Sequence, residues 1–210
     1  IFEGGTYDGG LIIDRDDLTF ELNGATVGPG SSAFTVSADD ITINGPGVID
    51  GTGHVTGDYA ILVQDGADNL IIDGVEVRNW TEAINVLGIH ESFKLVNSWI
   101  HSNAVGFLTG DPSSFTGVVT IEGNLFKNNT GPGVAYGGTG TLDATYNSWG
   151  ADTGPGTVEE AGTNVVYDPW VFSEIYLDME PDTTGDQYTS TISHENAFEV
   201  AVMADAENLS

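Results

Sequence analysis

Short apolar runs recur along this chain at a nearly constant spacing. Apolar residues at Val77, Ile100 and Phe126 follow one another at intervals of 23 and 26 residues. A second set repeats at the same two intervals: Ile72, Leu95 and Ile121. Each member lies in a short β-rich run bounded by turn residues, and no helical period is present. This pattern predicts an all-β solenoid in which each turn stacks on the turn before it.

We therefore predict a right-handed parallel β-helix of about six to seven turns. A turn of three short strands cannot cover its own apolar side, so the next turn must stack on it, about 4.8 Å away, to pair the backbone and bury the inward side chains. The first turns are expected at 4–27 and 34–49, and the last clear turn at 142–149. The third turn contains an inserted loop, 51–58, which is expected to project from one edge.

The repeat pattern ends near residue 172. We predict a β-helix domain over residues 1–172 and a C-terminal extension over 173–210. Residues 178–187 are acidic and are predicted to form a linker. In residues 197–203 apolar and polar positions alternate, which predicts a single strand. This strand either starts a β-sandwich module or is donated to a neighbouring subunit, as in β-strand addition. The alternative is a tail at a chain boundary with no structure of its own.

The charge of the chain is strongly one-sided. Its 210 residues include 32 Asp and Glu against four Lys and Arg, which gives a net charge of −28. Nucleic acid and anionic membrane surfaces are excluded as natural partners, because both require clustered basic residues. No apolar run is long enough for membrane insertion. An acidic, hydrated surface is typical of proteins that work in high salt, and specific divalent-cation binding is the alternative.

Cysteine is absent, so no disulfide supports the fold and none marks the compartment. Glycine occurs 29 times, which suits a fold with frequent turns. The chain opens at Ile1 rather than methionine, which is compatible with removal of a leader.

Several stretches resemble known protein families. Residues Ile41 to Gly51 resemble the early turns of pectin-degrading β-helix proteins. Residues Tyr146 to Pro155, followed by Val165 to Trp170, are similar to the end of the β-helix repeats of secreted and surface-layer proteins of archaea and bacteria. The resemblance covers residues 4–170 and implies a fold and an extracellular, cell-surface location, but no single activity. The tail strand with Ala206 to Leu209 resembles the first strand of an immunoglobulin-like or cohesin-like module.

No catalytic residues are assigned. The Asn-Thr-Asp, Gly-His-Gly and Arg-Ile-Lys motifs of pectin hydrolases are missing, and Gly53-His54-Val55 is only a partial match. Carboxylate doublets such as Asp16-Asp17 and Asp39-Asp40 precede strands, where aspartate is favoured for hydrogen bonding within turns. Abundant acidic residues are therefore no sign of the paired carboxylates of a glycosidase.

The few basic residues fall into register. Arg78 and Lys127 occupy equivalent positions two turns apart with His101 between them, and period-2 alternation directs all three outward. Trp99 and Leu125 flank this column on the same face. A lyase needs an Arg or Lys to abstract a proton, usually with calcium. Our hypothesis is that the column binds an acidic glycan or an acidic neighbouring subunit, and the alternative is ordinary exposed side chains.

Three Asn-X-Ser/Thr sequons are glycosylation candidates: Asn79, Asn128 and Asn208. Asn79 and Asn128 align, with Ser102 between them, and each follows an outward residue. We predict that they point inward and form a polar ladder at a turn. Glycosylation would instead require exposure.

No metal site is assigned and no cofactor is required. Calcium is the ion for which two groups of carboxylates could supply hard oxygen ligands. These groups are Asp14, Asp16 and Asp17, and Asp178, Glu180, Asp182 and Asp186. The four histidines lack the spacing of zinc ligands.

Two functions are compatible with this sequence. The first is a non-catalytic extracellular structural protein, a β-helix subunit of a cell-surface layer, sheath or filament, which polymerises through its ends or its tail strand. Trp149 and Trp170 are expected to cap one end. The second is a secreted polysaccharide-active or carbohydrate-binding protein that uses the Arg78 column and the loop 51–58.

Overall fold

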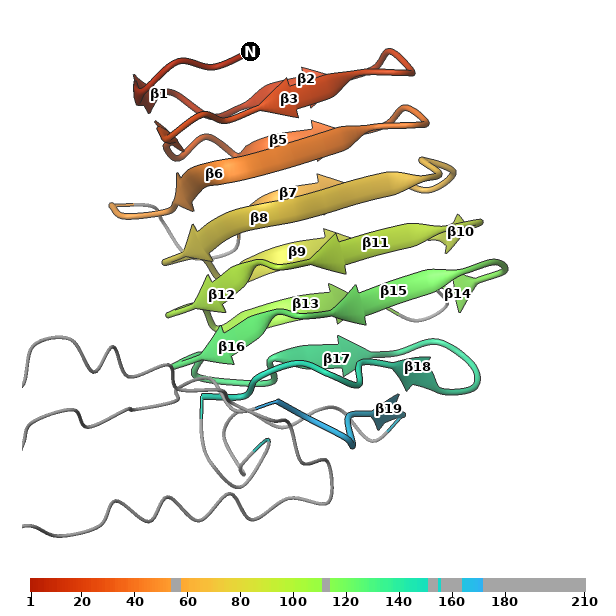
Figure 1. The fold of residues 1–210 in the computed structure, drawn as a ribbon. Helices are drawn as coiled ribbons and strands as arrows, with labels where there is room; N and C mark the ends of the chain where they lie inside the picture. The colour runs from red at the N-terminus through yellow and green to blue at the C-terminus, as the bar shows by residue number, and fades with distance from the viewer. Residues whose placement is uncertain (54–57, 111–113, 151–154, 156–163, 172–210) are drawn as a thin grey trace, which may run out of the picture. The chain divides into compact units, whose positions relative to one another are not determined.

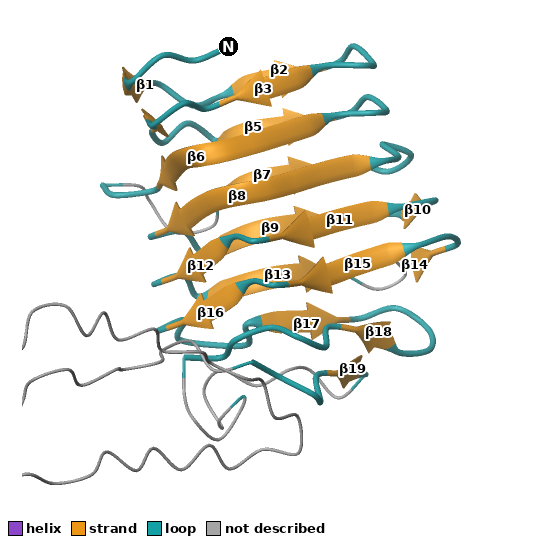
Figure 2. Cartoon of the chain, viewed as in Figure 1, coloured by secondary structure: helices purple, strands orange, loops and turns teal. Residues whose placement is uncertain are grey.

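The computed structural model describes residues 1–53, 58–110, 114–150, 155 and 164–171, and every regular element within them is a β-strand (Figures 1 and 2). These residues contain no helix that is long and apolar enough to cross a membrane. The strands are β1 Gly5–Tyr7, β2 Leu11–Ile13, β3 Thr19–Glu21, β4 Ala25–Val27, β5 Ser32–Val36, β6 Thr42–Asp50, β7 Tyr59–Val63, β8 Leu70–Arg78, β9 Glu82–Val86, β10 Ile89–His90, β11 Phe93–Val96, β12 Trp99–His101, β13 Val105–Thr109, β14 Ser114–Phe115, β15 Val119–Glu122, β16 Leu125–Lys127, β17 Val134–Tyr136, β18 Leu142–Asp143 and β19 Val165–Val166.

The strands form a parallel β-solenoid of about six turns, which confirms the predicted fold class (Figure 1). One wall is a six-stranded sheet in the order β17-β13-β9-β7-β5-β2. The other is a nine-stranded sheet built on the path β1-β4-β6-β8-β11-β15, with β3, β12 and β16 attached. The long strands β6 and β8 each cross the whole width of this second wall. In the next two turns the same width is covered by two shorter strands, β11 and β12 and then β15 and β16.

Apolar residues stack in register along the interior. Ile49, Val77, Ile100 and Phe126 pair from one turn to the next, and all four are fully buried. The second column pairs in the same way: Ile43, Ile72, Leu95 and Ile121. Both columns were predicted from their spacing, and both predictions are confirmed. The physical cause is that adjacent turns are hydrogen-bonded in parallel register, so like residues lie over like residues, and the one irregularity between β6 and β8, between Asn44 and Gly47, leaves both columns aligned.

The six-stranded sheet supplies the facing side of the core. Its central column runs through five consecutive turns: Phe34, Ile61, Ile84, Phe107 and Val134. All five side chains are fully buried. Because the second wall covers only one face of these strands, inward and outward positions alternate along them.

Aromatic residues close the last described layers of the core. Trp149 is fully buried and stacks on Phe126, with ring centroids 5.1 Å apart. Trp170 is half-buried against the same core. At the first turn, Phe2 makes an edge contact with Phe34 at 6.4 Å. Both tryptophans lie in the last described part of the solenoid, and their capping of an open end stays a prediction.

A ladder of buried polar side chains runs along one corner of the solenoid. The Oδ1 atom of Asn124 accepts the backbone N–H of Ser98 at 2.9 Å, and Oδ1 of Asn147 accepts that of Asn124 at 2.9 Å. The Nδ2 group of Asn124 donates to the Leu95 carbonyl at 2.9 Å. Each side chain thus satisfies backbone groups that the turn leaves without a strand partner.

A second ladder corrects the prediction made for the sequons. Asn79 and Asn128 do not point inward: both are exposed, with φ angles of 63° and 57°. The inward asparagines are Asn103 and Asn129, which are 1% and 2% exposed. The left-handed residue after each strand breaks the period-2 alternation, so the following residue points in instead.

The predicted linker and tail strand, including the sequon at Asn208, lie outside the described residues, as do residues 54–57 of the loop 51–58.

Candidate functional site

The predicted outward column exists, and it is longer than the sequence indicated. Arg78, His101 and Lys127 pair in register on three successive turns, and Asp50 precedes them on the turn before. Trp99 pairs with Leu125 on one side, in the adjacent outward row. The geometry predicted for these residues is therefore confirmed, while binding by the column stays a prediction.

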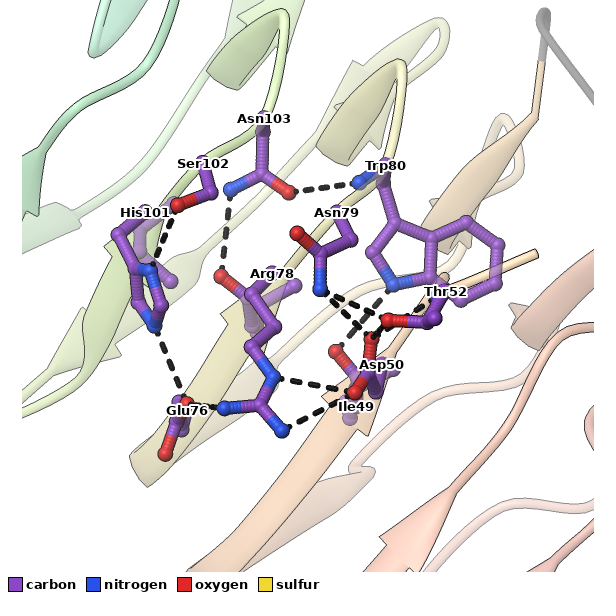
Figure 3. Close-up of polar contacts among 12 residues, drawn as sticks. Ile49, Asp50, Thr52, Glu76, Arg78, Asn79, Trp80, His101, Ser102 and Asn103 are labelled. Carbon is purple, nitrogen blue, oxygen red and sulfur yellow. Dashed lines mark hydrogen bonds and ion pairs between the residues drawn. The ribbon is translucent and has the colours of Figure 1, made fainter. Parts of the chain in front are cut away.

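Carboxylates neutralise the cation at the centre of the column. The Arg78 guanidinium donates from Nε to Oδ2 of Asp50 at 3.1 Å, and its Nη2 lies 3.0 Å from the same oxygen. Its Nη1 donates to Oε1 of Glu76 at 2.8 Å, and the His101 Nε2 lies 3.1 Å from that oxygen (Figure 3). Sequence reasoning missed Asp50 and Glu76, although Asp50 falls at the repeat position of Arg78.

The ionisation of this cluster follows from its contacts. Burial alone would raise the pKa of Asp50, but hydrogen bonds from Asn79, Thr52 and Arg78 outweigh it and lower the pKa from 3.8 to about 2. Burial alone would lower the pKa of Arg78, but Asp50 and Glu76 together raise it. Both groups therefore stay charged over the whole physiological range.

This electrostatic arrangement is poorly suited to proton transfer. A general base must lose its proton near the working pH, and the raised pKa of Arg78 prevents that. A general acid must hold a proton there, and the lowered pKa of Asp50 prevents that as well. The cluster is therefore better suited to holding turns together or contacting a ligand than to serving as an acid–base pair.

Trp99 presents an aromatic surface beside the cluster. Its indole stacks on the His101 ring with centroids 4.1 Å apart and planes inclined by 27°. It is nevertheless 42% exposed. The His101 Nδ1 lies 3.0 Å from the Ser102 hydroxyl, so contacts on both ring nitrogens and on one face fix the imidazole beneath the indole.

Shallow depressions run along the outer face of the nine-stranded sheet next to Trp99. The first has a volume of about 340 Å³. It is lined by Gly24, Pro46, Val48, Glu76, Asn97 and Trp99, among others. The second has a similar volume and is lined by Asp73, Lys94, Val96, Asn97, Glu122 and Tyr146, among others. Asn97 lines both, so the two depressions are neighbours, and we call them together the Trp99 groove.

The carboxylate doublets make structural hydrogen bonds, but not the local bonds within turns that the sequence suggested. The Asp16 carboxylate accepts the backbone N–H of Asp39 at 3.0 Å, and the Asp39 carboxylate accepts that of Asp68 at 2.8 Å. The bonds link successive turns rather than residues of one turn. In the part of the chain that the structure describes, no three His, Cys, Asp or Glu side chains gather to hold a metal ion, and Asp14, Asp16 and Asp17 form no such group. The second set, at 178–186, lies outside that part.

The chain matches no protein-family model, no curated protein and no solved structure. Its function is therefore argued from the geometry of the solenoid and of the residues on its outer face.

Proposed function

We propose that this protein is a non-catalytic extracellular structural protein, a β-solenoid subunit of a cell-surface layer, sheath or filament. The observation that carries the proposal is that the outward charged groups are engaged in bonds between turns. Arg78 joins its turn to that of Asp50, and Glu76 joins the same turn to that of His101. The asparagine ladders make equivalent connections on the inside. Such a wall is built to keep its shape.

Assembly through the ends of the solenoid follows from the pairing of its first strands. Among the described strands, β2 pairs only with β5, and β3 pairs only with β6. The other edge of β2 presents backbone donors and acceptors that a strand from a second copy would satisfy, whereas at β3 the Glu21 carbonyl already accepts the Phe2 N–H at 2.8 Å. A homopolymer built end to end would extend the same parallel ladder.

Electron microscopy of the full purified chain, at low and at high salt, tests this proposal. We expect ordered filaments or sheets that grow with protein concentration, most readily in high salt, because screening relieves the repulsion between chains of charge −28. Trp99→Ala is the matched control, since it changes an outward side chain and leaves the strand edges intact. Monomeric particles under all conditions would contradict the proposal, as would robust release of uronate from polysaccharides with or without calcium.

Carbohydrate binding in the Trp99 groove is the second candidate function. Trp99 and Tyr146 are 42% and 53% exposed, and each lines one of the two neighbouring depressions. Exposed aromatic faces suit the apolar faces of sugar rings, and neighbouring carboxylates accept hydrogen bonds from hydroxyl groups. These two features favour a glycan chain lying along the groove.

The charges of the groove favour a neutral glycan over the acidic glycan that the basic column first suggested. Asp73, Glu76 and Glu122 line the groove, whereas Lys94 is its only basic lining residue among those described. Arg78 already contacts two carboxylates. A uronate chain would therefore meet net negative charge.

Retention on insoluble cellulose, chitin and xylan, compared with polygalacturonate, tests the second function. We expect Trp99→Ala to weaken retention on a neutral polymer about tenfold, a change typical of losing one aromatic contact and its buried area. Ile89→Ala is the control, because Ile89 is 55% exposed and does not line the groove. Equal retention of both variants, or preferential retention on polygalacturonate, would contradict binding at this site.

A further inference from the structure

The two described sequons occupy equivalent corners of the solenoid but differ in what holds their side chains. Asn79 and Asn128 both follow a strand, both adopt a left-handed backbone conformation and both are exposed. Both are followed by a buried residue, Trp80 or Asn129, and then by threonine. Exposure therefore does not distinguish the two asparagines as glycosylation sites, whereas the hydrogen bonds of their carboxamide groups do.

The Nδ2 group of Asn79 is held by two hydrogen-bond acceptors. It donates to Oδ1 of Asp50 at 2.8 Å and to the Thr52 hydroxyl at 3.0 Å (Figure 3). Asp50 in turn pairs with Arg78. A glycan on Nδ2 would replace one of these N–H groups and introduce a sugar beside the ion pair, so modification would cost a charge-assisted hydrogen bond.

The Asn128 amide has no such partner. Its side chain is exposed and makes no hydrogen bond to any described residue, and Thr130 is exposed as well. The corner itself is fixed, because Oδ1 of Asn129 accepts the backbone N–H of Asn103 at 3.1 Å and its Nδ2 donates to the Ile100 carbonyl at 3.0 Å. The asparagine ladder thus holds the backbone while the neighbouring carboxamide projects outward.

We propose that Asn128 is a site of N-linked glycan attachment and that Asn79 is not. In the transfer, Nδ2 of Asn128 bonds to the anomeric carbon of a lipid-linked oligosaccharide, the bond from that carbon to the lipid diphosphate breaks, and the amide proton passes to a base of the transferring enzyme. The inference rests on the proposed extracellular location, because the donor and the enzyme act on exported chains. A glycan here would lie on the outer corner that carries the column of Arg78, His101 and Lys127.

To test this, the full chain is expressed as a secreted protein in a eukaryotic host that modifies Asn-X-Thr sequons. Its glycopeptides are then mapped by mass spectrometry before and after enzymatic deglycosylation. We expect occupancy at Asn128 to exceed that at Asn79 by about tenfold, since the Asn79 amide must first leave two acceptors. Asn128→Gln and Thr130→Ala should each remove the Asn128 glycan, whereas Asn79→Gln should leave it in place. Thr130→Ala keeps the left-handed asparagine, so it separates loss of the acceptor from damage to the corner.

Equal or greater occupancy at Asn79 would overturn the inference. An unmodified Asn128 in a secreted chain would also overturn it, provided that a reporter glycoprotein from the same cells is glycosylated. Neither outcome bears on whether the purified chain assembles, which electron microscopy reports independently.

Discussion

Arg78 and Asp50 lie on consecutive turns of the solenoid and meet through two nitrogen atoms, with Nε 3.1 Å and Nη2 3.0 Å from the same carboxylate oxygen. Twenty-eight residues separate them along the chain. The insertion between them does not disturb their register, because Asp50 still pairs with Arg78 in the ladder. Their contact links two turns on the outside of the wall and holds both groups in their charged forms.

Replacing Asp50 with asparagine should alter how stability depends on pH. The pKa of Asp50 is about 2 in the folded chain and 3.8 ordinarily, so the folded state binds the proton less tightly than the unfolded state. The stabilisation is complete above the unfolded pKa and is lost as pH falls from about 4 toward 2. We expect Asp50→Asn to cost about 1 kcal/mol at neutral pH, after allowance for solvent screening.

Urea unfolding between pH 2 and pH 7 measures this effect. The difference between the two proteins should shrink as pH falls through that window. Asp14→Asn controls for the loss of one negative charge, because Asp14 is exposed. A difference that is constant from pH 2 to pH 7 would argue against the ion pair as its source.

Asn124→Ala should be among the most destabilising polar substitutions in the described chain. It would leave the Ser98 N–H without its acceptor and the Leu95 carbonyl without its donor, both in the interior. We expect a loss of about 2–4 kcal/mol in the free energy of unfolding. Asn128→Gly is the control, since glycine tolerates the φ of 57° and the side chain removed is exposed. Similar losses in both variants would refute the role of the ladder.

Phe126→Ala should leave a cavity in the core between Ile100 on one turn and Trp149 on the other side. Phe126 is fully buried, lies in register below Ile100 and stacks on Trp149. A loss of about 3–5 kcal/mol is expected from the removed ring and the void it leaves. Ile12→Ala should change stability by less than about 0.5 kcal/mol, because Ile12 is 71% exposed. Thermal unfolding of both variants checks the contrast, and a small effect at Phe126 would mean that the core does not depend on this column.

Gly45→Ala should disrupt the packing of two neighbouring turns. A Cβ atom on Gly45 would overlap the carbonyl oxygen of Gly74 on the next turn, so backbone must move in one of the two strands. We expect a loss of more than about 2 kcal/mol. Gly110→Ala is the matched control, because a Cβ there would meet no heavy atom within 4 Å. Denaturant midpoints that agree within error would show that the turns can separate without cost.

Much of the fold could be predicted because the solenoid repeats one local pattern. The columns through Val77 and Ile72 were visible as matched intervals, and the outward Arg78 column followed from alternation within the same strands. Spacing was sufficient because each turn pairs with the next in parallel, and the one register shift, between Asn44 and Gly47 of β6, does not move the column residues out of line.

The details of the candidate site could not be predicted in the same way. Alternation placed Asn79 and Asn128 inside, but each adopts the left-handed conformation that ends its strand, and the inward position passes to the next residue. The adjacent pair Asn128-Asn129 indicated that one of these two asparagines belongs to the ladder, since two consecutive residues cannot both point inward. Nothing in the spacing separated the two.

The sequence by itself determined the class of the fold, the length of its repeat and the residues that share a column, because periodic burial is a property of the chain's own pattern. The tertiary structure decided which charged side chains lie within bonding distance of one another. Whether Arg78 faces a ligand or is neutralised by Asp50 and Glu76 depends on side-chain directions and distances of about 3 Å between turns, and a one-dimensional pattern contains neither.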